Sequence, residues 1–99
     1  MFVIIWEFRI RPERRAEFER HYGPRGTWAE LFAQDAAYRG TTLLRDARDG
    51  DLYLTLDRWE NAAALAAFKA AHGARYGEID AMCEALTLSE RKVGEYEEV

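Results

Sequence analysis

Four side chains in this 99-residue sequence are the candidates for a functional site: His72, Trp59, Phe8 and Tyr76. His72 closes an alanine-rich segment, and because histidine titrates near neutral pH it is the candidate catalytic base. Trp59 ends an alternating apolar segment just before that helix, where it can line the mouth of a cleft. Phe8 and Tyr76 are candidates for the wall of the same pocket. The structural alternatives are a histidine stabilised by a helix C-terminus and a tryptophan buried in the core.

No short motif in the sequence marks a common catalytic site. There is no glycine-rich phosphate loop and no His-x-x-x-His pair, and the only serine, Ser89, is not in a nucleophile elbow. One cysteine, Cys83, and two histidines cannot assemble a zinc site. Asp57, Arg58 and Glu60 are interpreted as charges facing solvent at the end of a strand. We therefore expect no cofactor and no metal.

Composition excludes several classes of partner. The 14 basic and 18 acidic residues give a net charge of −4, whereas a nucleic-acid-binding domain usually carries a basic surface. No apolar run approaches the ~20 residues of a membrane span, and no secretory signal is visible after Met1. We expect one domain over residues 1–99, located in the cytoplasm, with no nucleic-acid or membrane partner.

Apolar periodicity predicts alternating groups of strands and helices. The predicted strands are residues 2–11, 38–46 and 52–59 and a last strand within 86–99; two short helices lie within residues 12–32, and further helices cover 62–72 and 74–85. Asn61 is a predicted N-cap and Thr27-x-x-Glu30 a predicted capping box. Thr87-x-x-Glu90 is a second possible cap, and Gly73 suits a left-handed helix terminus.

This order, β–αα–β–β–αα–β, predicts an α+β fold. One hairpin between two helical crossovers gives a four-stranded antiparallel sheet with the helices on one face. We therefore expect a ferredoxin-like sandwich.

The face of the sheet that the helices leave bare is expected to be apolar. We predict a patch that includes Val3, Ile5, Leu43 and Tyr53, larger than a monomer usually exposes. Because two-fold homo-oligomers are the commonest assemblies, a homodimer packed through its sheets is the expected result. The alternative is a monomer whose sheet face is merely amphipathic.

Several segments together resemble the antibiotic biosynthesis monooxygenase-like family of the dimeric α+β barrel superfamily. They are FVIIWEFRIRPERRAEFERHYG, TWAELF, YRGTTLLRD, LYLTLDRW and FKAAH, which span most of residues 2–96. The resemblance implies ferredoxin-like protomers whose sheets form a shared barrel. It also implies oxidation of phenols or quinols by O₂ without metal or flavin, in an apolar pocket between sheet and helices.

The leading hypothesis is therefore a homodimeric, cofactor-independent monooxygenase acting on an aromatic phenol or quinol, with His72 as base and Trp59 as pocket wall. The alternative is a non-catalytic small-molecule-binding or regulatory dimer of the same fold. A haem-degrading branch is a third hypothesis, and the resemblance ties it to an asparagine on the first strand. Phe8, or Glu7 in a shifted register, occupies that position here, which argues against haem degradation.

Overall fold

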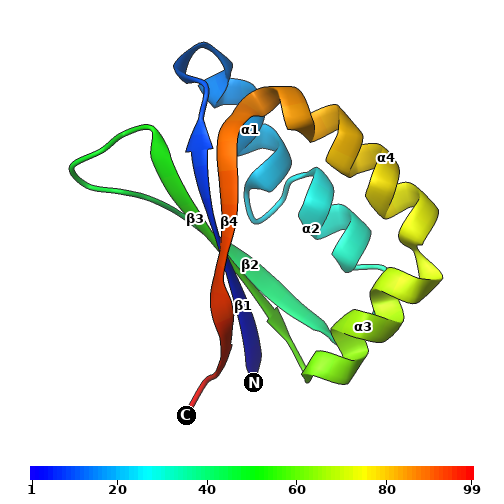
Figure 1. Ribbon diagram of the computed structural model, residues 1–99. Coiled ribbons are helices and arrows are strands. Elements are labelled where there is room, and N and C mark those ends of the chain that lie inside the picture. The colour runs from blue at the N-terminus through cyan, green and yellow to red at the C-terminus, as the bar shows by residue number, and fades with distance from the viewer.

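Alternating apolar side chains build four strands; helices connect the first strand to the second and the third to the fourth, and a hairpin turn connects the second to the third (Figure 1). In the computed structural model, which describes residues 1–99, the elements are β1 (Phe2–Ile10), α1 (Arg15–Tyr22), α2 (Thr27–Phe32), β2 (Tyr38–Arg45), β3 (Leu52–Trp59), α3 (Ala62–Ala71), α4 (Gly73–Cys83) and β4 (Thr87–Glu97), with 3₁₀ turns at Pro12–Arg14 and Glu84–Leu86. None of the helices combines the length and apolar character that crossing a membrane requires.

The strands form one antiparallel sheet in the order β2–β3–β1–β4. Figure 1 shows the four helices covering one face of this sheet, with the other face bare. The predicted α+β ferredoxin-like fold is confirmed. β4 forms one edge, and two register shifts interrupt its pairing with β1, at Ile5/Trp6 and at Arg9/Ile10.

The pairing register determines which side chains face the helices. Phe8 is paired with Tyr53, Trp6 with Thr55, and Phe2 with Trp59, and residues paired across an antiparallel ladder share a face. Tyr53 and Trp59 are almost fully buried. The side of the sheet that bears these pairs therefore forms the floor of the core.

The core between sheet and helices is rich in aromatic rings. Trp59 is fully buried, with its ring 5.5 Å from that of Phe32 and 5.2 Å from that of Phe68. Phe18 stacks on Tyr22 at 4.4 Å. Such pairs contribute about 0.5–1.5 kcal/mol each beyond their buried area. Because α1, α2 and α3 all supply rings, the aromatic cluster fixes the helices against the sheet.

The composition of the bare face differs from the sequence-based expectation. Leu43 and Tyr53 lie on the helix side, since Leu43 pairs with Thr55 and Tyr53 with Phe8. The apolar residues on the opposite side, called the outer face below, are Val3, Ile5, Leu44, Leu52, Leu54, Leu56 and Tyr96. Both sides of β3 are apolar enough to be buried, so alternation alone did not reveal which side the helices cover.

Helix ends confirm one predicted cap and correct three others. Asn61 caps α3, its side chain accepting a 2.8 Å hydrogen bond from the Ala64 backbone N–H. Thr27 is instead the first residue of α2, whose N-cap is Gly26, and its hydroxyl lies 2.7 Å from His21 Nδ1. Gly73 begins α4 without a positive φ, and Thr87 begins β4.

Candidate functional site

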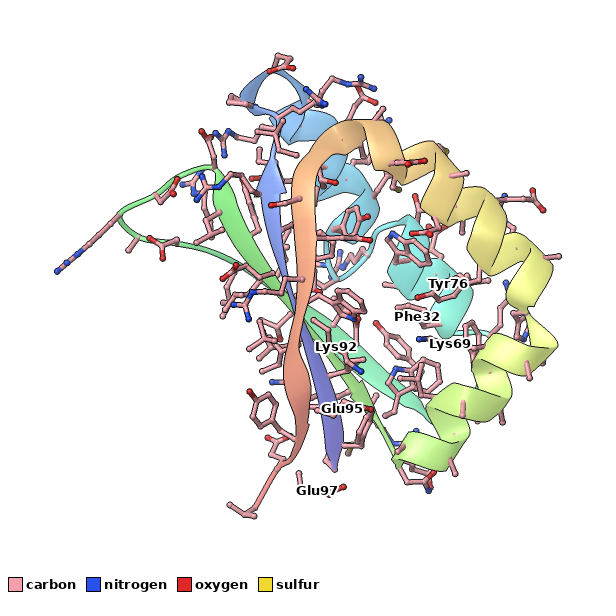
Figure 2. The ribbon with its side chains drawn as sticks, in the orientation of Figure 1. Phe32, Lys69, Tyr76, Lys92, Glu95 and Glu97 are labelled. Carbon is pink, nitrogen blue, oxygen red and sulfur yellow. The ribbon has the colours of Figure 1, made fainter.

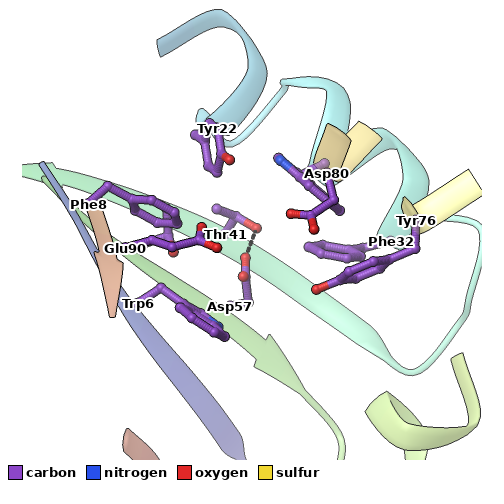
Figure 3. A pocket seen from close by; sticks show the side chains of 11 residues that line it. Trp6, Phe8, Tyr22, Phe32, Thr41, Asp57, Tyr76, Asp80 and Glu90 are labelled. Atoms are coloured by element: carbon purple, nitrogen blue, oxygen red, sulfur yellow. Dashed lines mark hydrogen bonds between the residues drawn. The ribbon is translucent and has the colours of Figure 1, made fainter. Parts of the chain in front are cut away.

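A cavity of about 80 Å³ lies between the sheet and the helices (Figure 3). Aromatic side chains form most of its wall, and three carboxylic acids and two threonines complete it. The lining residues are Trp6, Phe8, Tyr22, Trp28, Phe32, Thr41, Thr55, Asp57, Tyr76, Asp80 and Glu90. At this size it admits a single ring or a few water molecules, and it is smaller than the ~300–1,000 Å³ of most ligand pockets.

All four strands and three of the helices contribute to this cavity. Its floor is the helix side of the sheet, where Trp6 and Thr55 are paired. Its roof comes from α1, α2 and α4. Phe32 and Tyr76 both point into the layer between helices and sheet (Figure 2), so packing of the roof sets how far the cavity opens.

The aromatic walls hold one another in place. The Tyr76 ring meets the edge of Trp28 at 4.9 Å, and the Phe8 ring lies 4.8 Å from that of Tyr22. Lys69, on α3, places its ammonium 5.5 Å from the centre of the Tyr76 ring. An aromatic ligand would therefore meet rings on both its sheet side and its helix side.

Asp57 is the cavity carboxyl group that lies on an inner strand of the sheet, β3. It faces Thr41 across the β2–β3 ladder, and Thr41 Oγ1 donates a hydrogen bond of 2.5 Å to Asp57 Oδ1 (Figure 3). Thr41 Oγ1 also lies 2.5 Å from the hydroxyl of Tyr38. Burial raises the pKa of Asp57 to about 6, although the Thr41 hydrogen bond and the charge of Arg58 act in the opposite direction.

Two tyrosine hydroxyls and one further carboxyl group of the cavity also have raised pKa values. Burial raises the pKa of the Tyr22 and Tyr76 hydroxyls, so both remain protonated at neutral pH. Desolvation also raises the pKa of Glu90, with the charges of Asp80 and Glu84 adding to the effect. No group of three His, Cys, Asp or Glu side chains converges as a metal site requires.

A larger groove of about 530 Å³ adjoins the cavity. The two hollows share Tyr22, Asp80 and Glu90 in their walls. The groove is more polar, and its other lining residues are Arg11, Cys83, Glu84, Thr87, Leu88 and Ser89. Asp80 on α4 and Glu90 on β4 therefore lie at the boundary between an inner aromatic chamber and an outer polar groove.

Two of the four candidate residues line the cavity and two do not. Phe8 and Tyr76 are part of the wall. Trp59 lies one ring behind it, against Phe32, and its Nε1 has no hydrogen-bond partner. His72 lies at the junction of α3 and α4, where its ring stacks on Phe68 at 4.6 Å. A role for any of the four in binding or catalysis stays a prediction.

Asp57 is the residue that sequence reasoning missed. The interpretation of Asp57 as a charge facing solvent is wrong, because its side chain lines the cavity. The signal was present in the alternation of β3, since Asp57 shares a face with Tyr53, Thr55 and Trp59. Trp6 and Trp28, which were not among the four candidates, also line the cavity.

Comparison with solved structures shows the same fold in several bacterial proteins. SnoaB, a cofactor-independent oxygenase from Streptomyces nogalater, is 19% identical with a TM-score of 0.72, over 99% of this chain and 92% of that one. A Deinococcus radiodurans protein is 17% identical with a TM-score of 0.74, over 100% and 93% of the two chains. PA3566 from Pseudomonas aeruginosa is 18% identical with a TM-score of 0.70, over 99% of this chain and 93% of that one.

The sequence itself identifies the family. No curated protein matches the chain. The profile that describes antibiotic biosynthesis monooxygenases does match, over residues 1–75, which include β1 to β3, α1 to α3 and the start of α4. This match covers three quarters of the chain and confirms the resemblance noted in the sequence. The chain belongs to the antibiotic biosynthesis monooxygenase family.

Proposed function

We propose that the protein is a monooxygenase that oxidises an aromatic phenol or quinol with O₂, without a metal or flavin. The observation that carries the proposal is the aromatic cavity with a carboxyl group on its floor. Membership of the monooxygenase family and the fold shared with SnoaB, a cofactor-independent oxygenase, support it. Phe8 and Tyr76 are the proposed walls around the substrate ring.

The chemistry needs little beyond a base, orientation and a dry site. Loss of the phenol proton leaves an electron-rich anion that can react with O₂ directly. In the hydroxyl tautomer of an anthrone-like substrate, the ring carbon opposite the hydroxyl gains one oxygen as a ketone and loses its one hydrogen. This hydrogen and the hydroxyl proton leave with the second oxygen atom as water. The substrate supplies all four electrons, so no external reductant is needed. The aromatic walls would orient the ring and limit access of water.

The two adjoining hollows suit an elongated substrate. The inner cavity, at about 80 Å³, takes the reacting ring, and the groove of about 530 Å³ takes the remainder of the molecule. Such a substrate passes between Asp80 and Glu90. Because both side chains are exposed at this boundary, they can move without disturbing the core.

Oxygen consumption tests the proposal. The purified protein is mixed with anthrone-like phenols and hydroquinones in an oxygen electrode, and products are analysed after reaction under ¹⁸O₂. We expect uptake above buffer and one labelled oxygen per product molecule. Glu30→Gln, an exposed change on α2 outside the cavity, is the matched control and keeps the rate. Uptake no faster than buffer across the whole panel would contradict the proposal.

The two other hypotheses from the sequence are distinguished by ligand binding and by haem titration. A binding or regulatory protein would quench tryptophan fluorescence with an aromatic ligand and consume no oxygen. A haem-degrading enzyme would bind added haem and shift the Soret band of that haem at a stoichiometric ratio of haem to protein. For haem degradation, the register leaves no asparagine amide on β1: Phe8 faces the cavity, and Glu7 lies on the opposite side, 3.5 Å from Arg91.

We also propose that the protein is a homodimer in which a second copy covers the outer face. Leucines dominate this face, and Leu44 and Tyr96 are 46% and 47% exposed. Side chains from all four strands contribute to it, so it is continuous across the sheet. Charged residues such as Arg9 and Arg58 share this face with the leucines, as at interfaces whose apolar centre has a polar rim.

A further inference from the structure

One carboxyl group of the inner cavity lies on an inner strand of the sheet and is hydrogen-bonded to the neighbouring strand. Asp57 belongs to β3, near the middle of the ladder with β2, and its neighbours in the cavity are aromatic rings and hydroxyl groups. The other two carboxyl groups, of Asp80 and Glu90, lie at the boundary with the outer groove and are exposed. Asp57 is therefore the acid that a ring in the inner cavity would meet.

A chain of hydroxyl groups orients this carboxylate. Thr41 has one hydroxyl proton, and it is donated to Asp57 Oδ1, so the hydroxyl of Tyr38 donates to Thr41. The oxygen-to-oxygen distance is 2.5 Å in both hydrogen bonds. The second oxygen of Asp57, Oδ2, makes no hydrogen bond within the protein and remains available to a ligand hydroxyl.

We infer that Asp57 is the catalytic residue that accepts the substrate's hydroxyl proton, and that Thr41 and Tyr38 are positioning residues that hold it. This inference rests on the proposed function. In the step, the substrate O–H bond breaks, the proton moves to Oδ2 of Asp57, and the electron pair stays on the substrate oxygen. The resulting anion then reacts with O₂ as described above.

The environment of Asp57 suits this role better than that of His72. A pKa near 6 makes Asp57 a stronger base than an ordinary aspartate, while it stays ionised at neutral pH. His72 stacks on Phe68 and does not line the cavity. The charged and titratable groups that surround Asp57 are Arg58 on β3, Tyr38 on β2, Tyr22 on α1, Tyr76 and Asp80 on α4 and Glu90 on β4.

Steady-state kinetics of variants, using the best substrate of the oxygen-uptake panel, test the inference. Asp57→Asn keeps the shape and the bond from Thr41 but cannot accept the proton, so kcat should fall by about 10²–10⁴-fold with KM little changed. His72→Gln should stay within a few-fold of the wild type. Thermal unfolding checks that each variant is folded.

The pH profile separates proton acceptance from a structural role. Wild-type kcat/KM should rise with pH through an acid limb near 6, the pKa of Asp57. Thr41→Val removes a bond that favours the ionised carboxylate, so the limb should move to higher pH, and Thr41→Ser should restore it. Glu90 also has a raised pKa and could produce such a limb, so Glu90→Gln is the comparison variant. The acid limb in the kcat/KM profile of Glu90→Gln should stay at the wild-type pH.

The outcomes distinguish the two proposals. A wild-type protein that consumes no oxygen with any substrate overturns the proposed function and this inference with it. An active wild type with an equally active Asp57→Asn variant overturns the inference alone. A large loss in His72→Gln with Asp57→Asn unaffected would assign the base to His72.

Discussion

Thr41 and Asp57 are cross-strand partners on the helix side of the sheet, joined by a 2.5 Å hydrogen bond from Thr41 Oγ1 to Asp57 Oδ1. The bond favours the ionised carboxylate, and burial disfavours it. Burial is the larger effect, because the pKa of Asp57 is raised to about 6. The protein thus carries a carboxylate at neutral pH in surroundings that favour the neutral acid, which is a burden on stability of the kind found at functional sites.

Asp57→Asn is therefore expected to stabilise the protein, and only above about pH 4. The folded pKa of about 6 lies above the reference value of 3.8, so the favourable contribution of the neutral acid is complete below pH 4 and lost as pH rises to 6. Two pH units correspond to about 3 kcal/mol, and the asparagine amide oxygen can still accept the bond from Thr41.

Urea unfolding of both proteins at pH 4 and pH 8 measures this effect. The variant should exceed the wild type by about 2–3 kcal/mol in free energy of unfolding at pH 8, and by much less at pH 4. Because the other carboxyl groups are common to both proteins, the difference isolates residue 57. An equal difference at the two pH values would mean that Asp57 does not titrate with a raised pKa.

Trp59→Phe should leave substrate binding unchanged, in contrast to Trp6→Phe. Trp59 is fully buried behind Phe32, and its unpaired Nε1 costs about 1–3 kcal/mol that phenylalanine removes. This gain offsets the lost packing, so the free energy of unfolding should change by less than about 1.5 kcal/mol. Trp6 lines the cavity, so its replacement should alter KM.

Oxygen-uptake kinetics and urea unfolding of the two tryptophan variants provide the comparison. Both substitutions remove one ring of an indole, so the pair is matched in chemistry and differs in position. A tenfold rise in KM for Trp59→Phe with no change for Trp6→Phe would place Trp59 in the binding wall after all.

Local sequence signals predicted the elements well because they act over a few residues. The predicted third strand, residues 52–59, coincides with β3, and Asn61 caps α3. The side of β3 that faces the helices was not readable in this way. Leu52, Leu54 and Leu56 alternate with Tyr53 and Thr55, so either face could have been buried, and only the packing of the helices decides between them.

The candidate site was predicted less completely because its parts come from distant segments. Trp59 and His72 were selected for their positions at element ends, and neither lines the cavity. Trp59 lies behind the lining residue Phe32, and His72 stacks on Phe68, which is itself outside the cavity wall. Asp57 becomes a site residue only because α2 and α4 roof the sheet above it. A charge at the end of a strand is usually solvated, so the sequence favoured the ordinary interpretation.

Asn61→Ala should destabilise the protein by about 1 kcal/mol. The Asn61 side chain accepts a 2.8 Å bond from the Ala64 N–H, which otherwise has no partner in the first turn of α3. Asn61→Asp keeps an acceptor and is the matched control. Urea unfolding should show a lower midpoint for the alanine variant and an unchanged midpoint for the aspartate variant. If the midpoint falls equally in both variants, the loss of stability does not come from the hydrogen bond to the Ala64 N–H.

Leu54→Glu should dissociate the proposed dimer. Leu54 lies between Leu44 and Glu7 on the outer face, so the new carboxylate would be buried at the interface beside an existing one. Burying an unpaired charge costs several kcal/mol, whereas in a monomer the same side chain faces water. At micromolar concentration the wild type should sediment at twice the 11.5 kDa chain mass and Leu54→Glu at 11.5 kDa.

Met82→Glu is the matched control for this experiment. Met82 is 49% exposed on α4, which lies on the helix side of the sheet, so the same change of charge there should leave the dimer intact. A wild type that sediments at 11.5 kDa would show that the outer face meets solvent. A Leu54→Glu protein that remains dimeric would place the interface elsewhere, since a carboxylate at the centre of the leucine-rich face is incompatible with close packing of two such faces.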